Sequence, residues 1–196
     1  YIMSKGLITV LIFGVIVLFG GVWACNKRNR LVGLREDAKA QWQQLESQYQ
    51  RRADLVPDIV ASVKGEANFE KSTLEGVIGA RAKATQVTIN PDNLDEASIQ
   101  KYKAAQGELS SALSRLLVVS ENYPNLKSNA AFGDLRVTLE GCENRISTER
   151  MKYNDMARDF NKSIQFFPGS LIAGSMGQLP YFEAEAGAEK APKVEF

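Results

Sequence analysis

Two charged residues interrupt apolar helical stripes in this sequence, and they are the first candidates for chemistry. Arg52 stands on the stripe of the first helical segment, and Glu149 stands on the stripe of the last one. A charge buried in a helical core is unfavourable unless an opposite charge pairs with it. We therefore predict a buried ion pair between Arg52 and Glu149, with Arg115 or Arg145 as alternative cations, and we expect this pair to be structural.

The residue types that most catalytic and metal sites require are absent or isolated. Histidine does not occur, which excludes a Ser-His-Asp triad and the Glu-x-x-His ligands of carboxylate di-metal bundles. Cys25 and Cys142 lie far apart, and neither has a metal-type neighbour. The string GSLIAGSMG lacks the preceding strand and the lysine of a phosphate-binding loop. We predict no catalytic residue, no cofactor and no metal, in a protein that is not an enzyme.

An uncharged segment near the start of the chain predicts a membrane anchor. Gly6 to Cys25 contains no charged residue, and a helix of this length spans roughly 30 Å, the thickness of the hydrocarbon core of a bilayer. We predict a transmembrane helix over 6–25 after a flank over 1–5, with the lipid bilayer as its partner. The residues expected at the membrane interface are an aromatic residue and the cations that follow it: Trp23, Lys27, Arg28 and Arg30.

The cations on the two sides of this segment predict its orientation. Only Lys5 precedes the segment, whereas three cations follow it within five residues. Since positive flanks stay on the cytoplasmic side, we predict an N-terminus outside the cytoplasm and the rest of the chain inside it. The alternative is a lipoprotein acylated at Cys25, with the domain outside the cytoplasm, although Trp23 fits poorly beside a cleavage site.

The remainder of the chain has the pattern of amphipathic helices. Apolar residues recur at spacings of three and four from Leu31 to Phe160, and the strings VTINPDN and YPNLKSN interrupt them. Pro57 lies within the pattern and allows either a turn or a kink. A turn gives helices of about 31, 29, 29 and 38 residues, whose similar lengths suit neighbouring helices of a bundle. A kink keeps one long helix instead. The matched lengths favour the turn, and we predict an all-α fold, with an antiparallel up-and-down four-helix bundle over 26–167.

The chain changes character over its last segment, 168–196. Pro168 to Phe182 contains no charge, and such a stretch seldom stays in water unsupported. We expect it to pack on the bundle, touch the bilayer or contact another subunit. The string EAEAGAE is typical of a solvated linker, and APKVEF alternates apolar and charged residues, so it could add as a strand, dock in a groove or stay loosely held. The predicted interaction surface consists of Leu171, Ile172, Met176, Tyr181 and Phe182.

Seven strings resemble the LemA family of bacterial membrane proteins. They occur in order between Leu31 and Phe196: RRADLVPDIVASVKG, ARAKA, ALSRLLVVSENYPNLK, ENRIS, YNDMARDFN, FPGSLIAG and APKVEF. The resemblance implies a bacterial protein with an N-terminal membrane helix, an antiparallel helical bundle and a cytoplasmic domain. It implies no catalytic residues, and the family's biochemical role is not established. Many relatives carry a lipobox before the bundle, and the string VWAC departs from it.

Two functions are compatible with these features. The first is a non-enzymatic scaffold in the bacterial inner membrane that self-associates as a homo-oligomer. The second is an adaptor that binds another envelope protein through a bundle tip near Arg51, Arg52 and Asp54. A formal net charge of +1 gives no field that would attract nucleic acid.

Overall fold

The computed structural model describes residues 5–66 and 69–182, and in these ranges the chain is helical with no strand. The helices are α1 (Lys5–Lys64), α2 (Lys71–Gln86), the short 3-10 helix η1 (Pro91–Asn93), α3 (Glu96–Ser120), α4 (Pro124–Lys127), α5 (Ala130–Gln165) and α6 (Gly169–Ile172). The predicted all-α fold is confirmed, with a long apolar helix at its N-terminal end.

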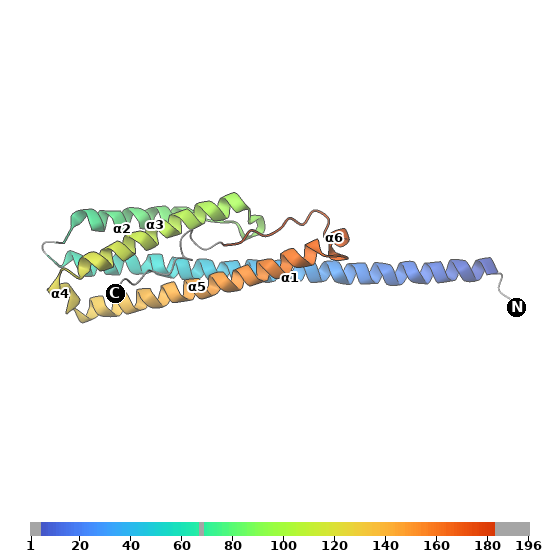
Figure 1. Ribbon diagram of the computed structural model, residues 1–196, viewed down its shortest axis with the longest axis horizontal. Coiled ribbons are helices and arrows are strands. Elements are labelled where there is room, and N and C mark those ends of the chain that lie inside the picture. Colours follow the sequence, from blue (N-terminus) through green and yellow to red (C-terminus); the bar gives the residue numbers. More distant parts are fainter. Residues whose placement is uncertain (1–4, 67–68, 183–196) are drawn as a thin grey trace, which may run out of the picture.

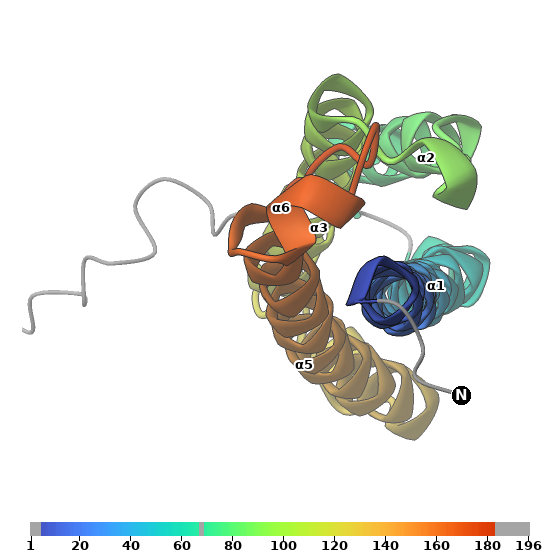
Figure 2. The same cartoon turned by 90° about the vertical axis from the view of Figure 1, so that its right-hand side faces the viewer.

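The molecule is an elongated helical domain from which the first half of α1 projects as a single rod (Figure 1). Within the domain, α5 packs along α1, α3 packs along α2, and α2 also contacts α1. The backbones of α3 and α5 approach each other much less closely than these pairs do. The end-on view shows this arrangement, with α1 between α5 and α2 (Figure 2). The domain therefore has one open side, between α3 and α5.

The chain does not turn at Pro57, so the predicted hairpin at this position is wrong. α1 continues through Pro57 to Lys64, and the link to α2 follows at Gly65. The Pro57 ring faces solvent, while Val56, Ile59 and Val60 on the other side of the helix are buried. Proline cannot donate the backbone hydrogen bond that the carbonyl of Ala53 would otherwise accept, and Nε of Arg81 on α2 donates to that oxygen instead, at 2.9 Å. Burial of the continuous apolar stripe outweighs that loss.

The buried residues form two clusters along the axis of the domain. The membrane-proximal cluster is built around Trp42, Tyr102, Tyr153 and Phe160. The distal cluster is aliphatic and contains Leu109, Leu113 and Leu116 of α3 together with residues of α1, α2 and α5. The boundary between the clusters falls next to Arg52 on α1, because Tyr49 belongs to the first cluster and Ala53 to the second.

The last described segment begins with a close contact against the end of α5. A Cβ atom added to Gly169 would lie 1.8 Å from the backbone oxygen of Ser163, so only glycine allows α6 to pack at this place. α6 contacts both α1 and α5. The chain then runs back along the domain to Phe182, which is buried.

Candidate interaction groove between α3 and α5

A polar layer around Arg52 lies between the two apolar clusters. Arg52 is 2% exposed, and its Nη1 donates to Oε1 of Glu143 on α5 at 2.7 Å. Its Nη2 donates to the backbone oxygen and to Oε1 of Gln106 on α3, at 2.9 and 2.8 Å. The guanidinium also lies over the ring of Tyr49, 5.2 Å from the centroid. Arg52 therefore links α1 to both helices that border the open side.

The predicted pair between Arg52 and Glu149 is not formed. Glu149 instead accepts a hydrogen bond from Nε2 of Gln41 and forms an ion pair with Lys152, whose Nζ lies 2.8 Å from the carboxylate. The ion pair with Lys152 and the bond from Gln41 lower the pKa of the Glu149 carboxyl. The alternative cations Arg115 and Arg145 are exposed. Arg52 is buried and paired as expected, but its acidic partner is Glu143, six residues earlier on α5.

Two asparagines of α5 hold the C-terminal segment by its main chain. The side-chain amide of Asn161 donates to the oxygen of Leu179, and the Leu179 N–H donates back to Oδ1, both at 2.8 Å. Asn154 makes the same pair of bonds with the backbone of Phe182, at 2.9 and 2.7 Å. The hydroxyl of Tyr153 donates to the oxygen of Pro180 at 2.9 Å. These bonds fix an extended segment on the open side of the domain.

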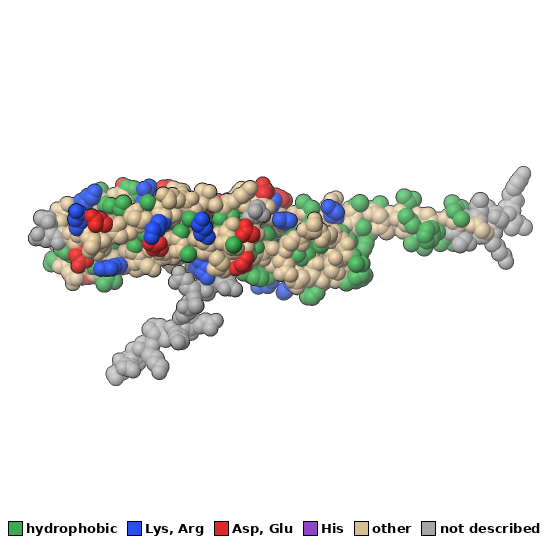
Figure 3. Space-filling model, turned by 90° about the horizontal axis from the view of Figure 1, so that it is seen from above, with side chains coloured by type: hydrophobic (Ala, Val, Ile, Leu, Met, Phe, Trp, Pro, Cys, Tyr) green, Lys and Arg blue, Asp and Glu red, His purple; other side chains and the backbone are tan. Residues whose placement is uncertain are grey.

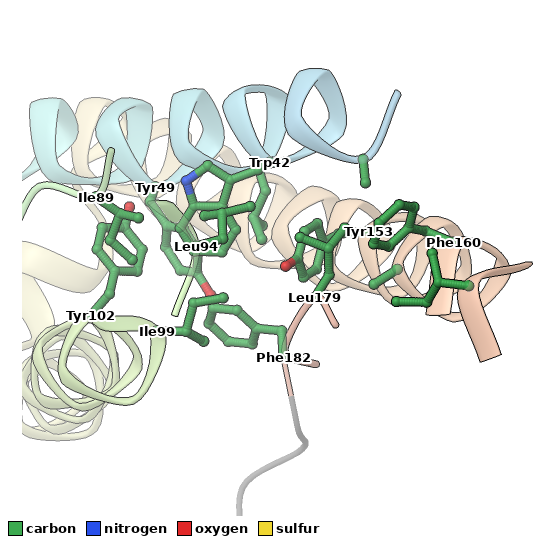
Figure 4. Packing of buried hydrophobic residues seen from close by; sticks show 14 of the residues in the cluster. Trp42, Tyr49, Ile89, Leu94, Ile99, Tyr102, Tyr153, Phe160, Leu179 and Phe182 are labelled. Atoms are coloured by element: carbon green, nitrogen blue, oxygen red, sulfur yellow. The ribbon is translucent and has the colours of Figure 1, made fainter. Parts of the chain in front are cut away.

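The ring of Phe182 fills part of the space between the helices. It lies 6.2 Å from the ring of Trp42 and 6.1 Å from that of Tyr49, between centroids. Figure 4 shows Phe182 and Leu179 among aromatic and aliphatic side chains of α1, α3 and α5. The guanidinium of Arg150 covers the ring at 5.1 Å. The segment up to Phe182 thus completes the membrane-proximal core.

The open side continues beyond Phe182 as a groove between α3 and α5. A small cavity of about 60 Å³ lies next to Phe182 and is lined by Lys103, Gln106, Glu143 and Arg150, among others. A larger one of about 410 Å³ follows, with Ser110 and Glu143 common to both. Its lining combines Leu113, Leu117 and Leu139 with Ser114, Glu140 and Asn144. We call these two cavities the α3–α5 groove; its apolar floor and polar rim suit an extended polypeptide.

The titratable side chains of the described residues have two features that bear on chemistry. No group of three or more Cys, Asp or Glu residues among them could hold a metal ion. Burial raises the pKa of the hydroxyls of Tyr102 and Tyr153, which disfavours their ionised forms.

Comparison with known proteins decides the family. The LemA family model matches residues 41–196. This chain belongs to the LemA family. The family expected from the seven strings is thereby confirmed, and the match includes α3, α5 and residues 179–182.

Two relatives of this LemA-family chain are magnetosome proteins. Magnetosome protein MamQ of Magnetospirillum gryphiswaldense is 26% identical over 179 residues, which cover 81% of this chain and 66% of that protein. Magnetosome protein MamQ 2 of Paramagnetospirillum magneticum is 26% identical over 180 residues, covering 82% of this chain and 66% of its own length. The LemA-family chain thus spans slightly less than two thirds of these relatives.

The predicted interaction surface of this LemA-family protein is divided by the structure. Phe182 is buried, and Ile172 and Met176 are half-buried against the membrane-proximal cluster. Leu171 and Tyr181 remain 76% and 40% exposed. Most of the segment therefore packs on its own domain, the first of the three placements that its lack of charge predicts.

The predicted interface residues lie where α1 leaves the domain. α1 is long and apolar enough to cross a membrane, and Trp23 on it is 48% exposed. Lys27 and Arg30 line a cavity between α1 and the end of α5, whereas Arg28 is exposed and does not line it. The helix is continuous through Cys25.

Sequence reasoning missed the residues that hold the C-terminal segment. Asn154 and Asn161 are seven residues apart on α5, two helical turns, next to the buried Tyr153 and Phe160. Two amides on a buried face must find polar partners, and an uncharged segment further along the chain can supply them.

The residues predicted to form the tip of the bundle, Arg51, Arg52 and Asp54, do not lie at an end of the domain. They lie inside α1, which continues to Lys64, so the predicted position of the tip is wrong.

Proposed function

We propose that this LemA-family protein is a non-enzymatic scaffold, anchored in the bacterial inner membrane by α1, that self-associates through the α3–α5 groove. Residues 183–196 of one copy lie in the groove of a neighbouring copy. The observation that carries this proposal is the docking of residues 179–182 in the same opening by main-chain hydrogen bonds, with the groove continuing beyond Phe182.

The open groove gives this proposal its contact surface. We infer that α1, α2, α3 and α5 form an up-and-down bundle whose fourth side is incomplete, because α3 and α5 do not close on each other. At that place Leu117 is only half-buried, beside the buried Leu113 and Leu139, as expected of a bundle with an incomplete side. An extended segment would supply that cover.

The charges along the groove complement those of the proposed segment. Lys103 and Arg150 line the cavity next to Phe182, Glu143 borders both cavities, and Glu140 lines the farther one. The segment carries Glu183, Glu185 and Glu189 first, then Lys190 and Lys193, and Glu195 near its end. If the segment extends from Phe182 along the groove, its first glutamates lie near the cations of the groove, and its two lysines lie near the acids of the groove. Complementary charges of this kind set register and direction more than affinity.

Length and anchoring make a neighbouring copy an accessible partner. Fourteen extended residues after Phe182 reach up to ~46 Å, several times the ~10 Å diameter of a helix. Two copies anchored in one membrane hold their grooves at the same height, which raises the effective concentration of each segment at the other groove. Reciprocal exchange gives a closed two-fold dimer with two identical contacts. The groove of the segment's own domain is the competing site, and the experiment below separates the two.

The orientation follows from the charges that flank the apolar part of α1. Three cations after this segment against one before it favour a domain in the cytoplasm. A lipoprotein anchored at Cys25 would place the domain on the opposite side. Labelling of cysteines engineered into exposed positions of the domain, in intact cells with a membrane-impermeant reagent, distinguishes these topologies: the proposal expects no labelling until the cells are opened.

The relatives leave the biological process open. The two magnetosome proteins share 26% of aligned residues with this chain, and about a third of their length lies outside the match, so we transfer no magnetosome role from them. An adaptor that receives an extended segment of another envelope protein would use the same groove. That function predicts a second protein in fixed ratio, which self-association does not.

The experiment uses two full-length copies with different affinity tags, expressed together in membranes, with a photo-crosslinking residue in place of Val194. The proposal predicts crosslinks between the two tagged copies that map to α3 and α5. Ser114→Arg fills the larger cavity and should abolish these crosslinks. Ser111→Arg is the matched control, since it adds the same group to an exposed position of the same helix outside the groove, and it should preserve them.

Three outcomes would contradict self-association through the groove. Crosslinks only within one copy would show that the segment fills its own groove. Equal crosslinking in the two arginine variants would show that the contact lies elsewhere. Crosslinks to a different protein would favour the adaptor.

A further inference from the structure

A second cavity lies at the end of the domain from which the apolar part of α1 projects. It has a volume of about 440 Å³ and is bordered by α1 over Lys27–Leu34, by the end of α5 and by the start of α6. Leu31, Leu34 and Pro168 form its apolar floor. Lys27, Arg30 and Lys162 form its basic rim. It is remote from the α3–α5 groove and shares no lining residue with it.

The position of this cavity along α1 matches the headgroup layer of a bilayer. Lys27 follows the uncharged stretch that ends at Cys25 by two residues, and Leu34 follows it by nine, which corresponds to roughly 3 to 14 Å along the helix. The headgroup layer of each leaflet is about 5 to 7 Å thick. If the uncharged stretch spans the hydrocarbon, the near half of the cavity therefore opens at the level of lipid phosphates.

The rim carries an unbalanced positive charge. None of Lys27, Arg30 and Lys162 forms an ion pair with another residue in the part of the chain that the structure describes. The one acid of the lining, Asp159, lies 3.8 Å from the guanidinium of Arg158. Three cations around an apolar floor make a site for an anionic group that carries a hydrocarbon chain.

Exposed apolar side chains stand beside the basic rim. Phe166 and Phe167 follow α5 and are 67% and 79% exposed, and Leu171 on α6 is 76% exposed. Figure 3 shows hydrophobic side chains at this end of the domain, close to Lys and Arg side chains. Large apolar groups exposed together next to a membrane anchor are typical of residues that enter the interface.

We propose that this cavity binds one anionic phospholipid of the leaflet that the domain faces. Lys27, Arg30 and Lys162 hold the phosphate, and Phe166, Phe167 and Leu171 contact the first part of an acyl chain. The bound lipid joins α1 to the end of α5 and sets the angle between the domain and the membrane. This site is independent of self-association through the groove.

The test reconstitutes the full chain in nanodiscs with equal amounts of phosphatidylglycerol and phosphatidylcholine, and native mass spectrometry then counts the lipids retained after mild release. The wild type should retain one phosphatidylglycerol. Arg30→Gln and Lys162→Gln should each lower this retention by about tenfold, the factor expected for losing a contact of about 1.4 kcal/mol. Both positions are exposed, so the helical content measured by circular dichroism should be unchanged.

The matched control is Arg28→Gln. Arg28 lies two residues before Arg30 on α1, on the same side of the membrane, but does not line the cavity. The proposal predicts wild-type retention in this variant. Equal loss in the Arg28 and Arg30 variants would show diffuse attraction of anionic lipids and would overturn the site. Equal retention of the two lipids by the wild type would overturn it as well.

Discussion

Replacing Arg52 by methionine tests the polar layer between the two cores. Methionine keeps most of the side chain's volume and removes the guanidinium, so packing changes little. Its loss leaves Oε1 of Gln106, a residue that is 5% exposed, without its donor, whereas the Gln106 backbone oxygen keeps the helical bond from the N–H of Ser110 within α3. It also leaves Glu143 unpaired, but the Glu143 side chain is 39% exposed and can be hydrated.

These contacts set the magnitude of the effect. A buried acceptor that loses its partner destabilises a fold by about 1–3 kcal/mol, and this is the loss expected from Oε1 of Gln106. The exposed Glu143 carboxylate should add little to this loss. For a domain of this size, the change corresponds to a lowering of Tm by about 2–12 °C.

The measurement is thermal unfolding of the full chain in detergent micelles, followed by circular dichroism at a helix wavelength. Arg51→Met is the control, because Arg51 is exposed and its replacement should change the unfolding free energy by less than about 0.5 kcal/mol. If the Arg52 and Arg51 variants unfolded at the same temperature, the contacts between Arg52 and Gln106 would not stabilise the domain, and the reasoning would be refuted.

Contacts of α5 give three further predictions. Asn161→Ala removes both hydrogen bonds to the backbone of residue 179, and amide hydrogen exchange over 179–182 should speed up by about tenfold or more, measured by mass spectrometry. Phe182→Ala should lower the unfolding free energy by about 3 kcal/mol in urea titrations and shift the fluorescence of Trp42 to the red. The pKa of the Glu149 carboxyl is lowered by Lys152, so its stabilising contribution is complete above the ordinary carboxyl pKa of 4.5 and is lost as the pH falls below it; Glu149→Gln should flatten the acid side of the stability profile.

Each of these changes has a control or a contradicting result. Asn144→Ala alters an exposed position of α5 and should leave exchange over 179–182 unchanged. Phe166→Ala removes a ring that is 67% exposed, and its effect on stability should be small. Acid profiles of equal slope for wild type and Glu149→Gln would show that this carboxylate does not couple folding to pH.

The sequence predicted those parts of the fold that depend on local pattern. The uncharged stretch over Gly6–Cys25 and the apolar stripes are properties of single segments, so the helices and their buried faces follow from them. The turn at Pro57 was wrong because Nε of Arg81, a distant residue, replaces the missing backbone donor at the carbonyl of Ala53, and α1 continues through the proline. Gly65, directly after the last residue of α1, was the better signal for the end of this helix.

Pairings between distant segments could not be obtained in the same way. The stripe shows that Arg52 is buried and must have a partner, but Glu143 and Glu149 lie only about 9 Å apart along α5. The choice between them depends on where the chain turns and how far α5 slides along α1. The lack of charge in the last segment predicted that it needs cover, whereas its docking by Asn154 and Asn161 depends on the open side of the domain.

The central claim of this account is self-association of the anchored domain. Its most direct test is the mass of the complex extracted from native membranes in mild detergent, with the protein content identified by mass spectrometry. We expect the mass of the complex to be a whole-number multiple of the mass of this chain, with no other protein present. Ser114→Arg should reduce this mass to that of a single chain, whereas Ser111→Arg should leave it unchanged. A second protein in fixed ratio, or a single chain in the wild type, would contradict it.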